Sequence, residues 1–320
     1  MEFLLLAPLA LLLDYFLGEP SRFHPLIGFG KLASWLESTA NNKRFLLVRG
    51  IVAWMLAVIP ITLIVYYIDQ WMGGLWLGII CGWLAIGWRS LKEHGVAVIK
   101  ALEDGDIEKA QLKTAYLVSR DTSTLDETAL SKATIESLLE NGSDAIFAPL
   151  FWLVIFGAPG VVFYRLSNTL DAMWGYRNER FELFGKFTAR MDDILNIIPA
   201  RLSATLYLLF GNSKQAWQAW IAQGRKWYSP NAGIVMASGA GALTLSLGGD
   251  AIYKGKLKKR STLGYGKIAK TQDIHRALKL IDHSLVGLII LIAIIAVIGF
   301  TIPTPPLFAT FVNSIIMVFT

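Results

Sequence analysis

Two long stretches without a charged side chain constrain this chain more than any other feature. Residues 145–164 and residues 284–320 contain no Asp, Glu, Lys or Arg. A helix needs roughly 20 mainly apolar residues to cross about 30 Å of hydrocarbon. Charged residues make up only 17% of the chain, whereas a soluble domain has about 25%. The sequence therefore predicts a polytopic integral membrane protein of the all-α class, with a single membrane domain over residues 1–320.

Apolar segments and their polar connections outline the expected helical bundle. The stretch at 3–17 resembles the apolar core of a signal peptide, but Glu2 stands where a basic residue is expected and no cleavage site of small residues follows. We therefore expect an uncleaved, short first membrane segment. Proline ends helices, so the cluster at 303–306 divides the last apolar stretch. The expected membrane segments are 3–17, 46–68, 73–88, 145–164, 194–210, 231–248, 284–302 and 307–320.

A polar insertion, residues 89–144, interrupts the apolar segments and is expected to form water-facing helices. Thr124 and Glu127 have the spacing of a capping box, which predicts that a helix begins there. We expect this helix to run to Glu140 and to end at Asn141 and Gly142, since glycine and asparagine are common at helix C-termini.

The distribution of positive charge indicates how the segments are oriented. Cytoplasmic loops of membrane proteins carry an excess of Lys and Arg. If every membrane segment crossed the bilayer, the loop 249–283 would lie outside the cell, although it has nine Lys and Arg residues. The conflict disappears if 145–164 enters the membrane and returns on the same side. Pro149 and the break at Gly157–Gly160 (GAPG) favour such a re-entrant hairpin, with both neighbouring polar loops cytoplasmic.

Several kinds of site find no support in the sequence. Cys81 is the only cysteine, which excludes an intrachain disulfide and a cysteine metal cluster, and the four histidines lack metal-ligand spacing. The net charge of +6 fits either membrane topology or an anionic substrate. No nucleic-acid motif accompanies it, so no nucleic acid is expected as a partner. The glycine-rich phosphate loops and Ser/His/Asp patterns are also missing, so a nucleotide would bind in another way.

Acids, amides and arginines flank both ends of the segment 145–164. If this segment is a hairpin, its ends meet and these side chains gather at one patch. Ionisable residues at membrane depth are costly and are usually functional or paired. The flanking residues are Glu136, Glu140, Asn141 and Asp144 before the segment, Arg165, Asn168, Asp171 and Arg177 after it, and Arg190, Asp192, Asp193, Asn196 and Arg201 at the next segment.

The charged residues of this group each allow two interpretations. Glu136 and Glu140 lie one helical turn apart, so they either form a solvated helix face or hold a cation between them. Asp192 and Asp193 diverge by about 100° on a helix, so only one of them easily faces a given ion. Carboxylate ligands suit Mg²⁺, and arginines suit phosphate or carboxylate groups. Arg201 either has that binding role or pairs with Asp192 or Asp193.

Residues 229–260 supply the last candidates. Ser229 and Asn231 are either a helix N-cap or part of a substrate site. The small residues 239–241 favour close helix packing. The basic run 254–260 either fixes the topology or binds anionic lipid.

Taken together, these elements resemble one family in order along nearly the whole chain. They resemble the adenosylcobinamide-phosphate synthase family, membrane enzymes of cobalamin biosynthesis, although Glu19 stands where that family is expected to have Asp. The matching elements are Gly18–Pro20 with His24, Ser119–Asp126 (SRDTSTLD), Glu136–Asp144 (ESLLENGSD), Gly157–Gly160 (GAPG), Asn168–Asp171 (NTLD), Ala189–Asp193 (ARMDD), Pro199–Leu202 (PARL), Ser229–Gly233 (SPNAG) and Leu247–Gly249 (LGG).

The resemblance implies an ATP-dependent, Mg²⁺-using ligase. Such an enzyme joins the free propionate of adenosylcobyric acid to the amine of (R)-1-aminopropan-2-ol phosphate, or of aminopropanol. Our hypothesis for the matching positions makes Glu140, Asp144 and Asp193 catalytic, and Glu136, Glu140, Asp192 and Asp193 metal ligands. The hypothetical substrate-binding residues are Arg120, Asn141, Arg165, Asn168, Asp171, Arg190, Arg201, Ser229 and Asn231.

These expectations place the chain in the inner (cytoplasmic) membrane, with its active-site loops on the cytoplasmic side. The expected partners are the corrinoid, the amino-alcohol phosphate, membrane lipid, and either further copies of the chain or other membrane enzymes of cobalamin biosynthesis. Two alternatives from other classes stay open. One is a relative that kept the fold as a membrane sensor without catalysis, and the other is a transporter whose broken segment binds its substrate at the bilayer midplane.

Overall fold

A computed structural model describes residues 2–20, 24–41, 44–253 and 255–301. Most of them are helical. The α-helices are α1 (Glu2–Leu17), α2 (Pro25–Ala40), α3 (Leu46–Met72), α4 (Leu75–Ala85), α5 (Trp88–Glu103), α6 (Ile107–Ala115), α7 (Glu127–Gly142), α8 (Ala148–Trp174), α9 (Lys186–Leu195), α10 (Ile197–Phe210), α11 (Ser213–Gln223), α12 (Ala232–Leu243) and α13 (Thr271–Thr301). A π-helical turn, η1 (Ser143–Phe147), joins α7 to α8, and a short 3₁₀ turn, η2 (Gly224–Lys226), precedes α12.

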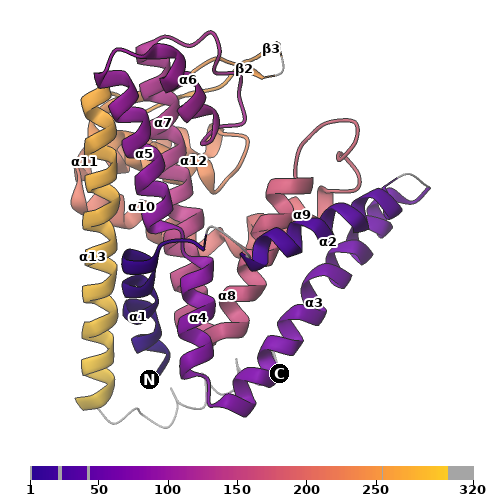
Figure 1. The fold of residues 1–320 in the computed structure, drawn as a ribbon. Coiled ribbons are helices and arrows are strands. Elements are labelled where there is room, and N and C mark those ends of the chain that lie inside the picture. Colours follow the sequence, from indigo (N-terminus) through magenta and orange to yellow (C-terminus); the bar gives the residue numbers. More distant parts are fainter. Residues whose placement is uncertain (1, 21–23, 42–43, 254, 302–320) are drawn as a thin grey trace.

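The helices form a lower half and an upper half in Figure 1, and the long apolar stretches extend into the lower half. Helices α1, α4, α8 and the C-terminal part of α13 form the lower, apolar half in that view. Helices α5, α6, α7, α11 and α12 form the upper half, and α13 runs along both. Helices α2 and α3 slant away from α13 and pack against α8, with a hydrophobic core of their own.

Three helical stretches are long and apolar enough to cross a membrane: α3, the run Glu127–Trp174, and Thr271–Ile298 of α13. The predictions of long apolar helices at 46–68 and 284–302 are therefore confirmed, and the segment 307–320 lies outside the described residues. Both α3 and α13 leave large apolar side chains uncovered, among them Val52, Leu56, Ile290 and Ile294. Exposed apolar surface on this scale marks contact with lipid or with another protein. These helices indicate a membrane protein.

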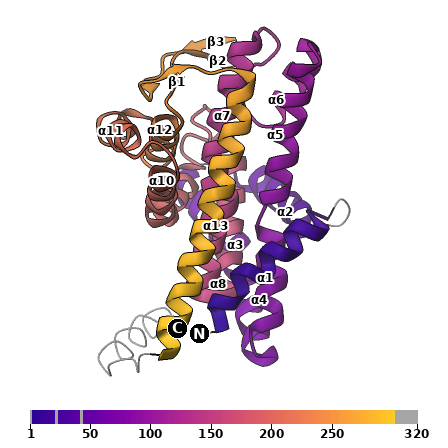
Figure 2. The same cartoon turned by 90° about the vertical axis from the view of Figure 1, so that its left-hand side faces the viewer.

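The prediction of a membrane span at 231–248 is wrong. Helix α12 has 12 residues, which is about 18 Å of helix and too short for about 30 Å of hydrocarbon. Its residues from Gly233 to Leu243 are buried. In Figure 2 the helices α10, α11 and α12 are seen nearly end-on, crossing the direction of α7 and α13. An apolar helix of this length is a core helix, which composition alone does not distinguish from a span.

The other short segments differ from expectation in length. The expected spans at 3–17 and 73–88 become α1 with 16 residues and α4 with 11 residues. The segment 194–210 becomes α10, which is bent by 49° against α9, and the two helices could count together as a fourth span.

The polar insertion is helical, as predicted, but its last helix neither begins nor ends where expected. Asp126 caps α7, because its Oδ1 accepts a hydrogen bond from the Ala129 backbone N–H at 2.8 Å. The predicted capping box at Thr124 is therefore wrong. Asn141 and Gly142 do not end the helix, since the π-helical turn η1 carries the chain on into α8.

The chain reverses direction inside α8, at the predicted break. Gly157 has φ 64° and ψ −148°, a conformation outside the helical region. The Tyr164 hydroxyl donates a hydrogen bond of 3.1 Å to the Asp144 carbonyl oxygen. In a straight helix these residues, 20 positions apart, would be separated by about 30 Å. The predicted hairpin is present as a turn of the chain, and its entry into a membrane from one side stays a prediction.

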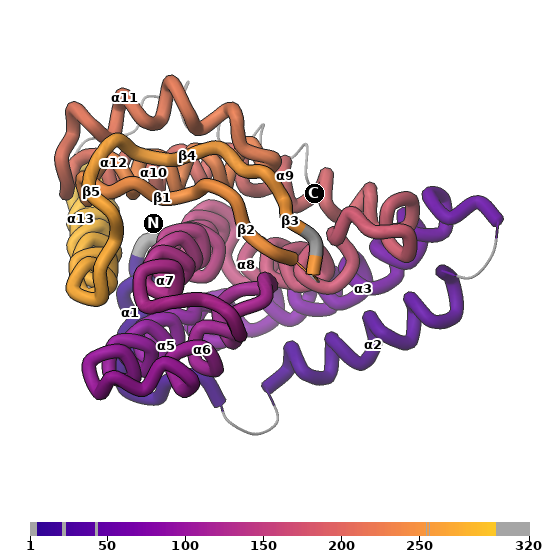
Figure 3. Tube along the Cα trace, turned by 90° about the horizontal axis from the view of Figure 1, so that it is seen from above, coloured from indigo at the N-terminus to yellow at the C-terminus, as the bar shows by residue number. Residues whose placement is uncertain are grey.

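Short strands follow α12, which the all-α prediction did not include. Strand β1 (Leu245–Gly248) pairs antiparallel with β4 (Thr262–Leu263) and parallel with β5 (Lys267–Ile268). Strands β2 (Ala251–Tyr253) and β3 (Lys256–Lys258) form an antiparallel pair. Figure 3 shows this strand region passing over the ends of α7 and α12. It brings residues near 250–260 close to α7, which matters for the site below.

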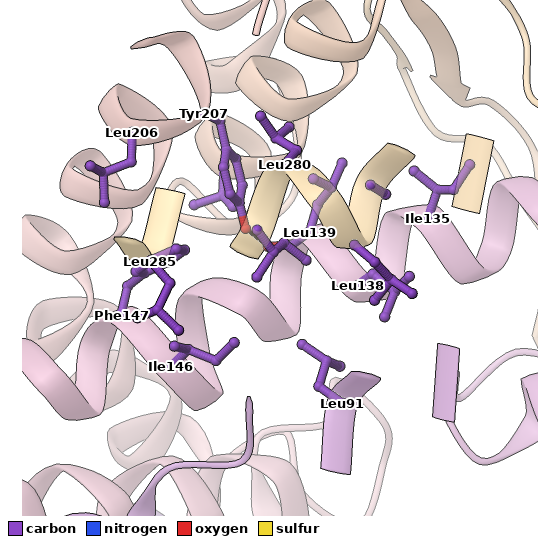
Figure 4. Close-up of a cluster of buried hydrophobic side chains, with 14 of the residues drawn as sticks. Leu91, Ile135, Leu138, Leu139, Ile146, Phe147, Leu206, Tyr207, Leu280 and Leu285 are labelled. Carbon is purple, nitrogen blue, oxygen red and sulfur yellow. Dashed lines mark hydrogen bonds between the residues drawn. The ribbon is translucent and has the colours of Figure 1, made fainter. Parts of the chain in front are cut away.

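The main core lies where α7, α10 and α13 meet. Leucine and isoleucine side chains from all three helices are buried there, together with Phe147 from η1 (Figure 4). Tyr207 of α10 donates its hydroxyl proton to the Leu139 carbonyl oxygen at 3.0 Å. A Cβ atom at Gly142 would lie 2.6 Å from that hydroxyl oxygen. The helices therefore approach closely at Gly142, and this packing fixes the position of the acidic end of α7.

Candidate active site

The reversal at Gly157 gathers four carboxyl groups at the junction of α7, α8 and α9. We call Glu140, Asp144, Asp171 and Asp192 the carboxylate cluster. Asp144 lies within electrostatic range of the other three, and Asp171 within range of Asp192, the neighbouring Asp193 and Glu140. Like charges at short range repel each other, and such arrangements are more frequent at functional sites than elsewhere. The sequence-based prediction that these residues meet is therefore confirmed.

Amide side chains hold Asp192 in place within the cluster. Asn168 donates to Asp192 Oδ1 at 3.0 Å, and Asn196 donates to Asp192 Oδ2 at 3.1 Å. Tyr164 donates to Asn196 Oδ1 at 3.1 Å as well as to the Asp144 carbonyl oxygen. A carboxylate that receives a hydrogen bond on each oxygen has a fixed orientation. Asn168, predicted to orient substrate, orients a carboxylate of the site in this structure.

Arg165 supplies positive charge beside the cluster. It interacts electrostatically with Asp144, and its Nε is buried without a hydrogen-bond partner among the described residues. A buried guanidinium N–H that no protein group accepts is available to an anionic ligand.

The N-terminal motif lies beside Arg165, a placement that sequence reasoning missed. Burial lowers the pKa of His24; Arg165 lowers it further, whereas Glu19 opposes the shift. A Cβ atom at Gly87 would lie 3.0 Å from Glu19 Oε1, and the Gly87 N–H donates to the Ala145 carbonyl at 2.9 Å. The signal in the sequence was the motif Gly18–Pro20 followed by His24. No role follows from the motif alone, because nothing in its spacing shows which distant segment it meets.

Asp193 faces different neighbours from Asp192, as their adjacency predicted. Arg190 and Arg177 interact electrostatically with Asp193. Asp192 accepts hydrogen bonds from the two asparagines, and Asp193 lies within electrostatic range of Asp171 and Asp192. Arg190 therefore acts at the edge of the site, next to Asp193.

Arg201, Ser229 and Asn231 connect two helices rather than lining the cluster. Arg201 donates to Asn231 Oδ1 at 3.1 Å, and Asn231 donates to the Asp193 carbonyl oxygen at 2.7 Å. Within the described residues Arg201 forms no ion pair with Asp192 or Asp193, so that alternative is not supported. Ser229 Oγ accepts from the Ala232 N–H at 3.3 Å, which gives it the N-capping role, while Asn231 makes no such bond.

Glu136 belongs to a second site, which we call the arginine pocket, formed with Arg120 and Arg260. Its carboxylate accepts from Arg120 Nη2 at 3.2 Å and from Arg260 Nη2 at 3.1 Å. The side chains of Arg120, Glu136 and Arg260 are 8%, 6% and 5% exposed. The Gly248 N–H also donates to Glu136 Oε1 at 2.8 Å. The solvated-face interpretation of Glu136 is therefore wrong.

The predicted metal ligands do not form one centre. Glu136 is engaged by two arginines, Asp193 faces arginines, and only Glu140 and Asp192 belong to the cluster. No group of three or more metal-ligating side chains stands in a metal-binding arrangement among the described residues. A nucleotide-bound Mg²⁺ needs only one or two protein carboxylates in addition to phosphate oxygens. Glu140 and Asp192 fit that smaller requirement.

A cavity of about 160 Å³ adjoins the arginine pocket and continues along α7. Asn141 lines it and donates to the Ser137 carbonyl and hydroxyl oxygens, both at 2.9 Å. Glu140 also lines it and interacts electrostatically with Asp192. Glu140 therefore connects the arginine pocket with the carboxylate cluster.

The fold and site together define a helical membrane protein with a half-buried, ionisable site at the junction of α7, α8 and α9. Comparison with known sequences identifies the family of this chain. Residues 7–281 match the family model described as "CobD/Cbib protein". The chain belongs to the CobD/Cbib family, in agreement with the resemblance seen in its motifs.

Relatives with this family's name occur in bacteria and archaea. A "Cobalamin biosynthesis protein CobD" of Stutzerimonas stutzeri is 53% identical over 275 residues, which cover 85% of this chain and 91% of that protein. One from Chromobacterium violaceum is 48% identical over 289 residues, 88% of this chain and 93% of that protein. A "Probable cobalamin biosynthesis protein CobD" of Methanocaldococcus jannaschii is 34% identical over 304 residues, 90% and 96% of the two chains. No solved structure matches this chain.

Proposed function

We propose that this protein acts in cobalamin biosynthesis as an amide-forming ligase. It joins adenosylcobyric acid, through its free propionate, to the amine of (R)-1-aminopropan-2-ol phosphate or of aminopropanol. The products are the adenosylcobinamide (phosphate) amide, ADP and inorganic phosphate. Membership of the CobD/Cbib family and the names of its relatives support this role.

One observation carries the proposal: the chain reversal at Gly157, which places Asp144, Arg165 and Asp192 together. An amine and a carboxylic acid do not condense in water until the acid is activated. ATP, bound with Mg²⁺, supplies the phosphoryl group that activates the acid. The chain contributes a carboxylate, which can accept a proton from the amine nucleophile. Beside it lies a guanidinium, which can bind the carboxylate of the substrate.

Each residue of the site then has a definite task. Arg165 binds the substrate carboxylate through its unpartnered N–H edge. Asp144 or Glu140 accepts the proton that the attacking amine loses as the C–N bond forms. Asn168 and Asn196 keep Asp192 oriented toward its neighbours. Because the residues of the cluster are half-buried, the site limits the access of water to the activated acid, which water would otherwise hydrolyse.

The site lies at the border of the apolar half, so we also propose that it opens to the cytoplasm at the inner membrane. The loop 176–180 between α8 and α9 tests this orientation. Cys81 is the only cysteine, so a Cys81→Ala chain with a new cysteine at Arg177 reports labelling at one position. We expect membrane-impermeant maleimide to label it in inverted vesicles and not in intact cells. Labelling in intact cells would refute the cytoplasmic orientation.

The direct test of function is amide formation by the purified chain in detergent. We expect product only when ATP, Mg²⁺, the corrinoid acid and the amine are all present. A chain that binds corrinoid without forming product under any of these conditions would point to a sensor. Movement of corrinoid across proteoliposomes without product would point to a transporter. Either result would refute the ligase.

A further inference from the structure

The first end of helix α10 lies at both limits of a charge-free segment. Asn196, the residue before α10, accepts a hydrogen bond from the Tyr164 hydroxyl through its Oδ1 atom at 3.1 Å. The same hydroxyl lies 3.1 Å from the Asp144 carbonyl oxygen. Asp144 directly precedes the segment 145–164, which has no charged side chain, and Tyr164 ends it. Helix α10 therefore begins at the level where this segment begins and ends.

The other end of α10 lies at the start of the second charge-free stretch. The Phe210 ring packs on Gly287 of α13, where a Cβ atom would collide with the ring. Gly287 belongs to the first turn of the stretch 284–320. Just before this stretch, Asp282 accepts a hydrogen bond from Lys92 Nζ at 2.7 Å. The end of α10 therefore also lies where polar contacts give way to apolar sequence.

A helix with both ends at this border runs along the membrane surface. Helix α10 has 14 residues, which is about 21 Å of helix. Figure 2 shows it nearly end-on, crossing the direction of α13. A helix that crosses the direction of a membrane-spanning helix does not itself span the same bilayer. The bent pair of α9 and α10, which length and composition allow as a fourth span, therefore fits an in-plane element better.

The outer face of α10 is apolar and uncovered. Ile198, Thr205 and Leu209 lie within about 40° of one another around the helix, at about 100° per residue. Ile198 is 60% exposed and Leu209 is 63% exposed, and Ile197 and Phe210 beside them are also exposed. An interfacial helix buries such a face at the boundary between lipid head groups and acyl chains. Because this face continues from the exposed apolar surface of α13, lipid is the partner that fits it.

The charge around this face favours anionic head groups. The charged residues of the range 194–249 are all basic: Arg201, Lys214, Arg225 and Lys226. Lys214 is exposed in the first turn of α11, and Trp217 follows it with 52% of its surface exposed. Tryptophan is enriched at membrane interfaces. Each Lys or Arg close to an anionic surface strengthens binding by up to about fivefold.

We propose that α10, together with α11, is an in-plane platform that rests on the anionic phospholipid surface of the leaflet next to the upper half of the molecule. The platform also positions the carboxylate cluster, because Asn196 at the start of α10 donates to Asp192 Oδ2 at 3.1 Å. It thereby holds the cluster at the depth of the lipid head groups. Lipid contact is independent of the proposed ligase activity, so each can fail without the other.

The depth of side chains in the bilayer tests the platform directly. Ile198→Cys, Thr205→Cys and Leu209→Cys, each in the Cys81→Ala chain, carry a nitroxide spin label in nanodiscs of phosphatidylcholine and phosphatidylglycerol. The relative access of oxygen and of a water-soluble nickel chelate reports the depth of each label. The three positions extend over about 16 Å of helix, so a span would change their depth stepwise. We expect one common depth near the head groups.

Labels on α13 and α6 calibrate the depth scale. Val286→Cys and Ile294→Cys replace exposed residues of α13, and the second label should lie deeper than the first by about 12 Å. Glu108→Cys, at an exposed position of α6, should behave as a site in water. Thermal unfolding of each labelled chain, compared with Cys81→Ala, checks that the label leaves the fold intact.

Head-group preference tests the charge of the platform. We expect spin-labelled phosphatidylglycerol to associate with the native chain more strongly than spin-labelled phosphatidylcholine. Lys214→Gln combined with Arg225→Gln should lower this ratio several-fold, because two basic side chains at the lipid surface are removed. Lys100→Gln combined with Lys109→Gln removes the same charge from exposed positions of α5 and α6 and should leave the ratio unchanged.

Four results would overturn the platform. Depth that increases stepwise from Ile198 to Leu209 would make α10 a span. Nickel access equal to that at Glu108 would place its outer face in water. Protection of the labels from both reagents would show that protein, such as a second copy of the chain, covers the face. Equal effects of the two charge variants would exclude anionic head groups as the partner.

Discussion

The carboxylate cluster and the arginine pocket lie one turn apart on α7 and accommodate buried charge in opposite ways. In the pocket Glu136 meets Arg120, Arg260 and the Gly248 N–H. In the cluster Asp144 meets three further carboxylates and one arginine. A paired buried charge is costly to disturb because its partner is left alone. A group of like charges, in contrast, becomes more stable when one of the charges is neutralised. The difference indicates that the pocket maintains the structure around Arg260, and it is to the cluster that the proposed function assigns the chemistry.

The largest expected effect is on catalysis, in the cluster. Asp144→Asn should lower kcat/KM for amide formation by about 10²- to 10⁴-fold, the contribution of a positioned general base. Its thermal unfolding temperature should stay equal or rise, because one of several repelling charges is removed. Asp104→Asn, at the exposed end of α5, is the matched control and should leave both quantities unchanged. Full activity of Asp144→Asn would remove this residue from the mechanism.

The next largest effect concerns stability, in the pocket. Glu136→Ala leaves two buried guanidinium groups without their shared partner and should lower the free energy of unfolding by about 3–5 kcal/mol. Denaturant or thermal unfolding in detergent measures it, with the exposed Glu108→Ala of α6 as the control. A Glu136→Ala chain as stable as the native one would show that the triad does not hold the strand region on α7, and the contrast between the two sites would fail.

The third largest effect concerns the backbone at Gly157, on which the carboxylate cluster depends and the arginine pocket does not. Gly157 has φ 64° and ψ −148°, which residues with a side chain adopt at a cost of about 1–3 kcal/mol. Gly157→Ala should therefore lower stability by this amount and reduce amide formation, since the cluster depends on the reversal. The ion pairs of the arginine pocket should be retained because no residue of α8 lines its cavity. Gly28→Ala, where a Cβ meets nothing within 4 Å, is the control. A Gly157→Ala chain in which the cluster and the arginine pocket are disrupted equally would contradict the independence of the two sites.

The smallest effect is expected at an ion pair outside both sites. Arg180 holds the pKa of Glu37 below its usual value, with Asn41 adding a further hydrogen bond. A depressed carboxyl pKa stabilises the fold above the unfolded pKa of about 4.3, and this contribution is lost as the pH falls through the folded value.

Because Arg180 is 66% exposed, solvent screens the pair and Glu37→Gln should cost no more than about 1 kcal/mol. The difference in unfolding temperature between the native chain and this variant should be present at neutral pH and shrink in acid, with amide formation unchanged. A difference that grows in acid would contradict the assignment.

Local patterns predicted the reversal well and the partners of individual side chains poorly. The Gly157–Gly160 break identified the turn, because only glycine adopts that backbone conformation easily. It followed that Asp144, Asp171 and Asp192 would meet. Glu136 was expected to bind metal with Glu140, since the two are one turn apart. Its actual partner Arg260 is 124 positions away, and no spacing rule relates residues at that separation.

The sequence also led to a wrong prediction of helix length. Residues 231–248 are apolar throughout much of their length, as a span would be. Thr244, with φ 57° and ψ 43°, ends α12 directly before β1, and the helix is enclosed by its neighbours. Lipid and a protein core are both apolar solvents, so hydropathy responds to them alike.

The sequence by itself determined the class of this protein: long apolar helices, a polar helical insertion, a glycine break and charged residues at both ends of that break. These follow from local physics, namely hydrophobic transfer and backbone sterics. Tertiary structure alone decided which charges are paired. Asp192 accepts hydrogen bonds from asparagines while Asp193 lies beside Arg190 and Arg177, and Glu136 meets Arg120 and Arg260, because these pairings depend on the packing of helices and strands that are distant in the chain.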